Sequence, residues 1–351
     1  MESLIPTWQV TLLCGILIWI VVSSMFNVTR IIRSLTQPWV SSCVISGTPI
    51  ILQIQKYQHS FLDALFAGLS CVVSVPFYTG FLPLLFWSGH GKLARQMTLL
   101  MAFCDYTGNC IKVSLALSIV LQREIRCILS ASSICTCLLV CLSYWIGVVD
   151  IVSGLVLGLA ILAFWLSIHD HVDNFVVSGQ NVTSFWAALS LLMLFAYPTP
   201  EFPTPSFEYH TAFTGVALGI VTGVQQTYEH FHHEQVARVF TPRLLMAAFA
   251  GRILIGIPTI LVVKFCSKAL AKWILPITAN ALGISIRSSG YVPALSGSST
   301  VKKSNGYLQK MFFFSNQDSL DVDTGIRLLQ YAGLAWSVVD LVPSIFSKLN
   351  L

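Results

Sequence analysis

The feature that most constrains this chain is a series of long apolar stretches that recurs along its whole length. A helix needs about 20 apolar residues to cross a bilayer core of roughly 30 Å. Backbone groups in hydrocarbon must be hydrogen-bonded within the chain, and these stretches lack the alternation of a barrel strand, so we expect helices. The predicted spans are Trp8–Phe26, Phe61–Trp87, Gln96–Leu121, Cys127–Gly147, Val148–Ile168, Phe185–Tyr197, Thr211–Val224, Leu244–Phe265 and Leu328–Phe346.

The composition excludes a soluble globular protein. Of 351 residues, 55% are hydrophobic and 10% are charged, which leaves too few ionisable side chains to cover a soluble surface. Trp8–Phe26 lacks a basic leader and is longer than a signal-peptide core, so we expect it to stay as an anchor. The predicted fold class is an all-α, polytopic transmembrane helical bundle of about eight to ten helices.

We divide the chain into three parts. Residues 1–60 are predicted to form an N-terminal anchor helix and loop, and residues 61–184 a membrane core. Residues 185–351 are predicted to hold the C-terminal transmembrane helices and a polar loop near 285–305 that lies outside the membrane.

Polar side chains inside apolar spans are costly and are therefore candidate functional groups. Asp105, Asn109 and Lys112 are spaced by four and three residues, which predicts that they share one face of a helix. Lys112 could bind phosphate in a cavity or extend its ammonium group to the membrane surface, and the spacing alone favours the second. Arg252, deep in its span, is predicted to need a carboxylate, carbonyl or water partner.

Histidines and cysteines do not predict a metal site. Most of the ten cysteines lie in apolar spans, where we expect small buried side chains. His169 and His171 with Asp170 and Asp173 lie at a span end, where a hydrated surface is the simpler interpretation. The same holds for the histidines of Glu229–Glu234, whereas His59 and His210 have no predicted partner.

Two segments resemble a known enzyme family. Phe77–Trp87, followed by Asp105–Lys112, resembles the entry to the catalytic core of lipid phosphate phosphatases, in particular the long-chain-base phosphate phosphatases. These form the sphingosine-1-phosphate phosphatase branch of the type 2 phosphatidic acid phosphatase superfamily. The resemblance covers roughly 1–112 and 148–351, and the flanks that resemble the plant members are Gln53–Phe66, Gly179–Trp186, Tyr197–Glu201 and Ala332–Pro343.

The resemblance implies phosphate transfer through a phosphohistidine, with no cofactor and no metal. Members carry a lysine followed seven residues later by Arg-Pro, then Pro-Ser-(Gly or Ser)-His, then an arginine and a histidine four residues before an aspartate. The lysine and arginines bind phosphate, one histidine attacks phosphorus, and the other protonates the leaving alcohol. The aspartate orients the attacking histidine.

Only two positions of these motifs match. Lys112 is similar to the phosphate-binding lysine, but Ile119 and Val120 stand where Arg-Pro is expected. Asp150 is similar to the orienting aspartate, but Ile146 occupies the position of the nucleophile. Lys112 and Asp150 are therefore predicted to be remnants of the phosphate-binding and catalytic sites.

The segment 113–147 is unlike the family and shorter than the stretch that it replaces. No histidine lies between His90 and His169, and Leu129–Ile134 is only faintly similar to the second motif. Altered splicing or an altered gene model is the simplest hypothesis. Sequencing transcripts across the codons for 112–150 tests it, and a transcript that encodes the full motifs would support it.

One further stretch imitates a motif. Trp87–His90 resembles the second motif without its proline, and Lys92 and Arg95 follow as if to bind an anion. The stretch precedes the motif lysine instead of following it, so a basic loop at the membrane surface is the expected interpretation.

Two functions remain open. The first is a multi-pass phosphatase of the endoplasmic reticulum membrane that acts on sphingoid-base 1-phosphates, with activity impaired by the missing histidines and Arg-Pro pair. The second is a non-catalytic membrane protein that binds membrane lipids or associates with the intact family enzyme. No nucleic-acid partner is expected in either case.

Overall fold

The computed structural model of this chain describes residues 5–36, 38, 61, 64–65, 68, 75–114, 135–197, 205–233, 246–282, 286–288, 291 and 320–351. At residues 75–76, 112–114, 135–153, 205–207, 287 and 320 it describes the backbone only. The predicted residues outside these ranges, among them Ile119, Val120 and most of the polar loop, lie outside the described part of the chain.

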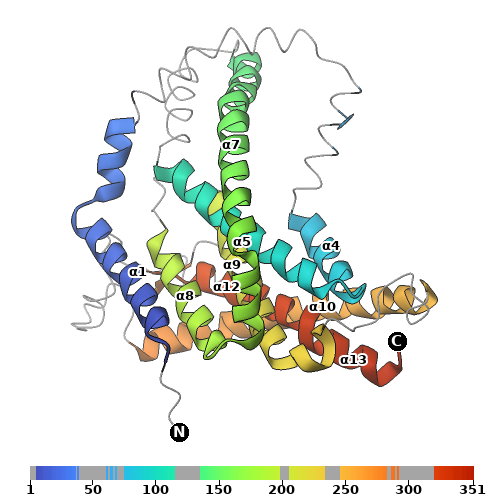
Figure 1. The fold of residues 1–351 in the computed structure, drawn as a ribbon. Coiled ribbons are helices and arrows are strands. Elements are labelled where there is room, and N and C mark those ends of the chain that lie inside the picture. Colours follow the sequence, from blue (N-terminus) through green and yellow to red (C-terminus); the bar gives the residue numbers. More distant parts are fainter. Residues whose placement is uncertain are drawn as a thin grey trace.

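The described part is a bundle of helices (Figure 1). Four segments are long and apolar enough to cross a membrane: α1, the Gly154–Ser178 section of α7, α10, and Val322–Leu349. This confirms the predicted all-α, polytopic bundle, and the number of spans in the whole chain stays a prediction. The elements are α1 (Thr7–Met25), α4 (Val75–Trp87), α5 (Gly91–Ser114), α7 (Cys135–Ser178), α8 (Val182–Ala196), α9 (Pro205–Thr227), η1 (Tyr228–His232), α10 (Met246–Ala281), β1 (Ile286–Arg287), β2 (Leu320–Asp321), α12 (Val322–Trp336), η3 (Ser337–Leu341) and α13 (Val342–Leu349).

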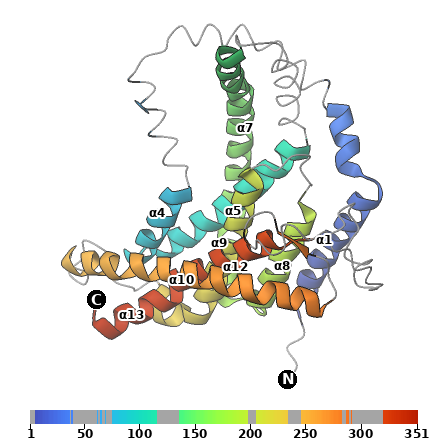
Figure 2. The same cartoon turned by 180° about the vertical axis from the view of Figure 1, so that it is seen from behind.

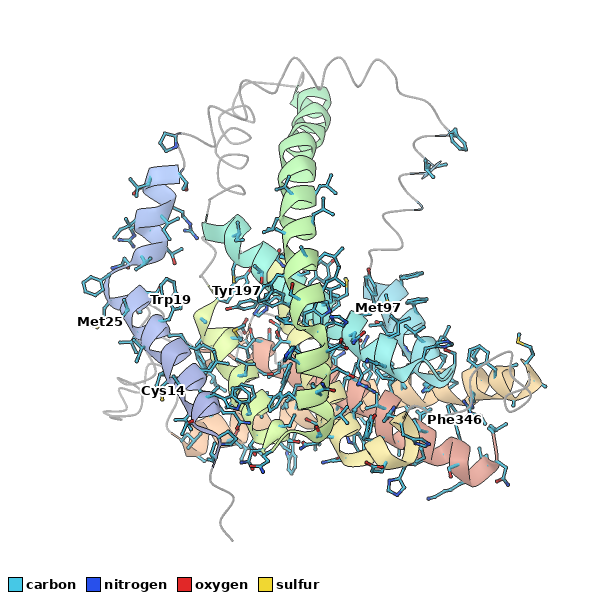
Figure 3. The ribbon with its side chains drawn as sticks, viewed as in Figure 1. Cys14, Trp19, Met25, Met97, Tyr197 and Phe346 are labelled. Atoms are coloured by element: carbon cyan, nitrogen blue, oxygen red, sulfur yellow. The ribbon has the colours of Figure 1, made fainter. Side chains whose placement is uncertain are left out.

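The outer surface of the bundle is apolar. Large side chains such as Trp19 and Met25 of α1 are mostly exposed (Figure 3). Leu254 and Phe265 of α10 are exposed in the same way. A surface of this kind suits contact with lipid tails, so the chain is a multi-pass membrane protein.

Helix α7 corrects one predicted boundary. The sequence predicted two spans that meet between Gly147 and Val148, but the structure has a single helix of 44 residues, Cys135–Ser178. The helix contains no proline, and each glycine in it lowers helix stability by only about 1 kcal/mol. No residue of the stretch therefore ends the helix. At about 1.5 Å per residue the helix is longer than a bilayer core is thick.

A short parallel pairing lies beside the helices. Strand β1 pairs with β2, with Ile286 opposite Leu320 and Arg287 opposite Asp321. The sequence analysis assigned β1 to a polar loop and did not predict this pairing. Its two-residue strands leave the fold class unchanged.

Helices α9 and α12 pack closely in the middle of the bundle (Figures 1 and 2). Gly215, Gly219 and Gly223 recur at every fourth residue of α9, so they lie on one side of the helix. A Cβ atom on Gly219 would overlap the carbonyl oxygen of Ala332 in α12. Small residues at such a contact let two helix backbones approach, as is common between helices in membranes.

The π-helix η3 offers its carbonyl oxygens to neighbouring side chains. Trp87 Nε1 donates to the Val338 oxygen at 3.1 Å, and His232 Nε2 lies 2.7 Å from the Val339 oxygen. Thr227 Oγ1 also donates to the Val339 oxygen, at 3.3 Å. Because unsatisfied buried carbonyls are costly, these bonds stabilise the irregular turn and tie α4, α9 and η1 to the C-terminal helices.

We expect Gly219→Leu to disrupt the contact between α9 and α12. The added side chain overlaps backbone atoms that cannot move independently, so we expect a loss of about 3 kcal/mol in stability and a lower melting temperature. Thermal unfolding of the detergent-solubilised protein measures this.

Gly158→Leu is the matched control, because a Cβ atom at Gly158 meets nothing within 4 Å. Equal melting temperatures for Gly219→Leu and Gly158→Leu would contradict the proposed packing.

Candidate functional site

The two motif remnants lie on helices that pack together. Lys112 lies in the last turn of α5, Asp150 lies on α7, and α5 contacts α7. The structure describes only the backbone at Lys112 and Asp150, so their roles in phosphate binding and catalysis stay predictions.

The polar face predicted on α5 is present. Asn109 Nδ2 donates to Asp105 Oδ1 at 3.0 Å, and both residues are partly buried. This confirms that the two side chains share a face, and the helical spacing continues that face to the backbone position of Lys112.

An aromatic group adjoins this face and was missed by the sequence analysis. His210 of α9 stacks on Tyr197 with ring centroids 4.5 Å apart and planes 11° apart. Tyr106 of α5 lies 5.1 Å from the His210 ring and 6.2 Å from the Tyr197 ring. The prediction that His210 has no partner was therefore wrong. The available signal was the proline-rich sequence Tyr197–Pro205, a composition typical of a connection between two helices.

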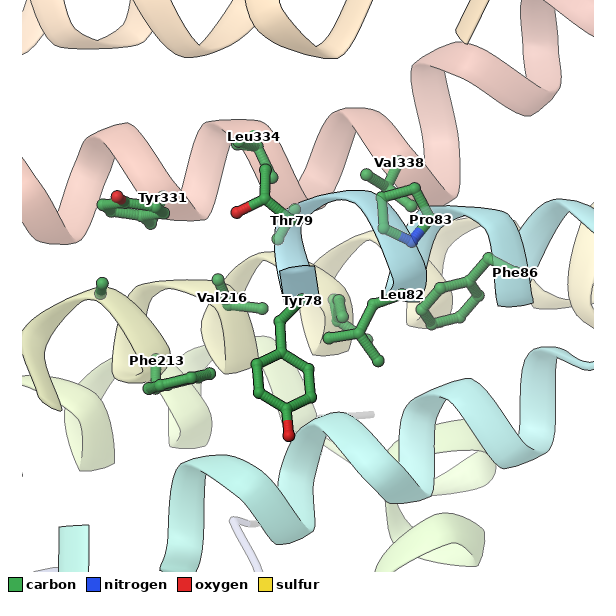
Figure 4. Close-up of a pocket in the computed structure, with 13 residues that line it drawn as sticks. Tyr78, Thr79, Leu82, Pro83, Phe86, Phe213, Val216, Tyr331, Leu334 and Val338 are labelled. Carbon is green, nitrogen blue, oxygen red and sulfur yellow. The ribbon is translucent and has the colours of Figure 1, made fainter. Parts of the chain in front are cut away.

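An apolar pocket lies next along α9 (Figure 4). Its volume is about 40 Å³, and α4, α9 and α12 with η3 supply its walls. Tyr78 lies at the side of α9, with its ring 6.2 Å from that of Phe213, and Thr79 and Tyr331 bring the other hydroxyl groups. The remaining lining residues are Leu82, Pro83, Phe86, Ala212, Val216, Ile220, Leu334, Ala335 and Val338.

The aromatic group and the pocket together suit an amphiphilic ligand. His210, in the aromatic group, lies three residues before Phe213 of the pocket, so the two side chains lie near one side of α9. A cavity with an apolar surface favours part of a hydrocarbon chain, and polar groups beside it can orient a headgroup.

The stretch that imitates a motif has a structural role. Arg95 is buried and forms two hydrogen bonds with Asp173 of α7, Nε to Oδ1 at 2.9 Å and Nη2 to Oδ2 at 3.0 Å. Lys92 lies 3.3 Å from Asp170 at the exposed end of the same contact. The anion-binding role suggested by Lys92 and Arg95 is therefore replaced by ion pairs within the protein. His90 contacts Ser88 Oγ at 3.1 Å on the surface.

The histidine-rich stretch after α9 has one buried member. The carbonyl oxygen of Val339 can only accept, so His232 carries its proton on Nε2. Burial lowers the pKa of His232 to about 4, and the nearby Arg95 charge acts in the same direction. His232 is therefore neutral at pH 7. Glu234, at the end of this stretch, lies outside the described residues.

Arg252 has the carbonyl partners that its position predicted. Its Nη1 donates to the oxygen of Trp87 at 2.7 Å and its Nη2 to that of Leu351 at 2.9 Å. The guanidinium also lies 5.5 Å from the ring centre of Phe346. These contacts join α4, α10 and the C-terminal helices, so Arg252 stabilises the bundle.

The chain is similar to a characterised relative over almost its whole length. It is 54% identical to lipid phosphate phosphatase delta of Arabidopsis thaliana, over 98% of this chain and 97% of the relative. The chain belongs to the lipid phosphate phosphatases. The alignment spans 403 positions, more than the 351 residues of this chain, so the relative has residues that this chain lacks. No protein-family model and no solved structure matches the chain.

We expect Arg95→Met to destabilise the protein strongly. The substitution leaves the carboxylate of Asp173 buried without its counter-ion, which costs about 3–5 kcal/mol. Thermal unfolding measures the loss, and Arg95→Met with Asp173→Leu is expected to recover part of it.

Lys92→Gln is the matched control. The pair of Lys92 with Asp170 is more than half exposed on both sides, so we expect a change of less than about 1 kcal/mol. A similar loss for Arg95→Met and Lys92→Gln would contradict the role of the buried pair.

We expect His232 to make the protein less stable in acid. The pKa of His232 falls from 6.5 to about 4 on folding, so its contribution is complete above pH 6.5 and is lost as the pH falls towards 4. At pH 5 the loss is about 2 kcal/mol. His232→Gln can keep a hydrogen bond to Val339 without titrating, and melting temperatures at pH 7 and pH 5 should fall less for this variant. Equal falls in both proteins would refute this assignment.

Proposed function

We propose that this chain is a catalytically impaired member of the family, derived from a phosphatase of sphingoid long-chain-base 1-phosphates. The observation that carries the proposal is the set of residues at motif positions. Ile119 and Val120 stand in place of Arg-Pro, and Ile146 stands in place of the attacking histidine. The greater length of the aligned relative supports a shortened segment in this chain.

The chemistry explains why these replacements matter. Isoleucine has neither a nucleophilic nor an acidic group, so Ile146 cannot form a phosphohistidine. Without the arginine, the charge that develops on the phosphate oxygens loses hydrogen-bond donors that are each worth about 10²–10³ in rate. Lys112 and Asp150 alone can bind phosphate and orient a partner, but they cannot replace the missing histidines.

The substrate class follows from the resemblance and from the shape of the bundle. A sphingoid-base 1-phosphate joins a long hydrocarbon chain to a phosphomonoester. The apolar pocket between α4, α9 and α12 suits part of such a chain, and the polar face of α5 leads towards the position of Lys112. We assign the protein to the endoplasmic reticulum membrane and place the core of the site in residues 61–184.

A non-catalytic role is the second candidate. The described helices pack around α9, and the apolar pocket between α4, α9 and α12 suits part of a lipid chain. In this role the protein binds membrane lipids or associates with the intact family enzyme.

We expect membranes that contain this chain to release phosphate from sphingoid-base 1-phosphate at the background rate. The comparison includes an Asp150→Asn variant, empty-vector membranes and phosphatidic acid as a second substrate, with protein amounts matched by immunoblot. Release above background that Asp150→Asn abolishes would show that another residue is the nucleophile, and the proposal of impaired catalysis would be wrong.

A further inference from the structure

A group of basic side chains meets Tyr291 on one side of α10 and α12. Lys264, Lys268 and Lys272 follow one another at every fourth residue of α10, so they lie along one side of that helix. Arg327 comes from α12. We call these four residues the basic cluster.

Aromatic rings lie between the cations. The Nζ atoms of Lys268 and Lys272 lie 4.0 and 5.6 Å from the ring centre of Tyr291, and the guanidinium carbon of Arg327 lies 5.3 Å from it. Lys264 Nζ lies 5.0 Å from the ring centre of Tyr331. These contacts favour the cations by about 0.5–1 kcal/mol each and hold them close together.

The position of Tyr291 is fixed by hydrogen bonds. The buried carboxylate of Asp323, near the start of α12, accepts from Ser288 Oγ at 2.6 Å and from the backbone N–H of Tyr291 at 3.3 Å. Arg327 Nε donates to the hydroxyl of Tyr291 at 3.3 Å. Tyr291 is therefore held against α12, which fixes the position of its ring among the cations of the basic cluster.

The cluster has an excess of positive charge. Among the described residues, Glu208 lies 2.7 Å from Arg327 and Asp323 contacts Tyr291, so two carboxylates accompany the four cations there. Like charges at every fourth residue of a helix repel one another. An anion with two negative charges would balance the excess.

The sequence around Lys268 and Lys272 favours a place near the membrane surface. Helix α10 has 36 residues, about 54 Å at 1.5 Å per residue, which is longer than the bilayer core. The predicted apolar span ends at Phe265, so Lys268 and Lys272 follow it, and the exposed Trp273 lies beside them. Lysines followed by an exposed tryptophan are typical of the membrane–water boundary.

We propose that the basic cluster binds a phosphate group at the membrane surface, carried by a lipid headgroup or free in solution. A phosphomonoester is close to doubly charged at pH 7 and accepts several hydrogen bonds, which fits flexible lysines beside one arginine. The site uses α10, α12 and Tyr291. It is separate from the motif positions on α5 and α7, so it does not depend on the proposed function.

The experiment measures binding by the purified full chain in detergent micelles. Two titrations monitor the melting temperature, one with inorganic phosphate at constant ionic strength and one with micelles that contain increasing phosphatidic acid in phosphatidylcholine. We expect Lys268→Gln with Lys272→Gln to weaken the apparent affinity about tenfold or more. Lys268→Arg with Lys272→Arg keeps both charges and should bind like the original chain.

Three variants complete the test. Lys92→Gln with Lys348→Gln removes two exposed lysines elsewhere and should leave the affinity unchanged within about twofold. Lys112→Gln separates this site from the motif position, because weaker binding in Lys112→Gln together with unchanged binding in the glutamine variants of the cluster would place the bound phosphate at the motif position and overturn the proposal. If the double glutamine variant does not fold, Lys272→Gln alone should weaken binding about threefold.

The outcomes are distinct. Binding of phosphatidic acid alone identifies a headgroup site, and binding of inorganic phosphate identifies a site for the phosphate group itself. The proposal is overturned if neither probe binds, or if the glutamine variants of the cluster bind as tightly as the original chain.

Discussion

The backbone contact between α9 and α12 determines where most other groups of the bundle lie. Because Gly219 brings the two backbones together, the side chains on the remaining faces of α9 are held against fixed neighbours. One end of α9 places His210 beside Tyr197, and the other places Thr227 near the Val339 oxygen. The apolar pocket opens on one side of the same contact. No residue with a Cβ atom could replace Gly219 without a shift of the neighbouring backbone, because that Cβ would overlap the carbonyl oxygen of Ala332.

Two sets of contacts outside residues 113–147 hold helices of the described bundle together. Arg95 with Asp173 joins α5 to α7, and Arg252 joins α10 to the ends of α4 and α13. None of these groups belongs to the motifs that the family uses for catalysis. The residues that pack these helices together are thus different from the motif residues that the family uses for catalysis. A change in the motif residues can therefore leave the packing unchanged.

The sequence predicted features that depend on neighbouring residues, and it failed where distant residues meet. The apolar spans, the shared face of Asp105 and Asn109, and the need of Arg252 for a carbonyl partner all follow from local spacing or local cost. The stacking of His210 on Tyr197 requires a chain reversal between two helices. The contact of Lys268 with Tyr291 joins residues that no local pattern relates. The neighbouring pairing of two-residue strands carries almost no sequence signal either. The sequence predicted two spans in place of α7 because the stretch is long enough for two helices of average span length. Length alone does not distinguish two such helices from one long helix.

The extra residue of the π-helix η3 is absorbed within a single turn. A π-turn holds one more residue than an α-turn, so loss of one residue within Ser337–Leu341 would restore regular α-helical hydrogen bonding and leave the direction of α13 unchanged. Phe346 would then keep its place beneath Arg252 and beside Trp87, whose ring centre lies 5.5 Å away. The loss would fall instead on Trp87 and His232, because main-chain N–H groups would compete for the carbonyl oxygens of η3 that these two side chains contact.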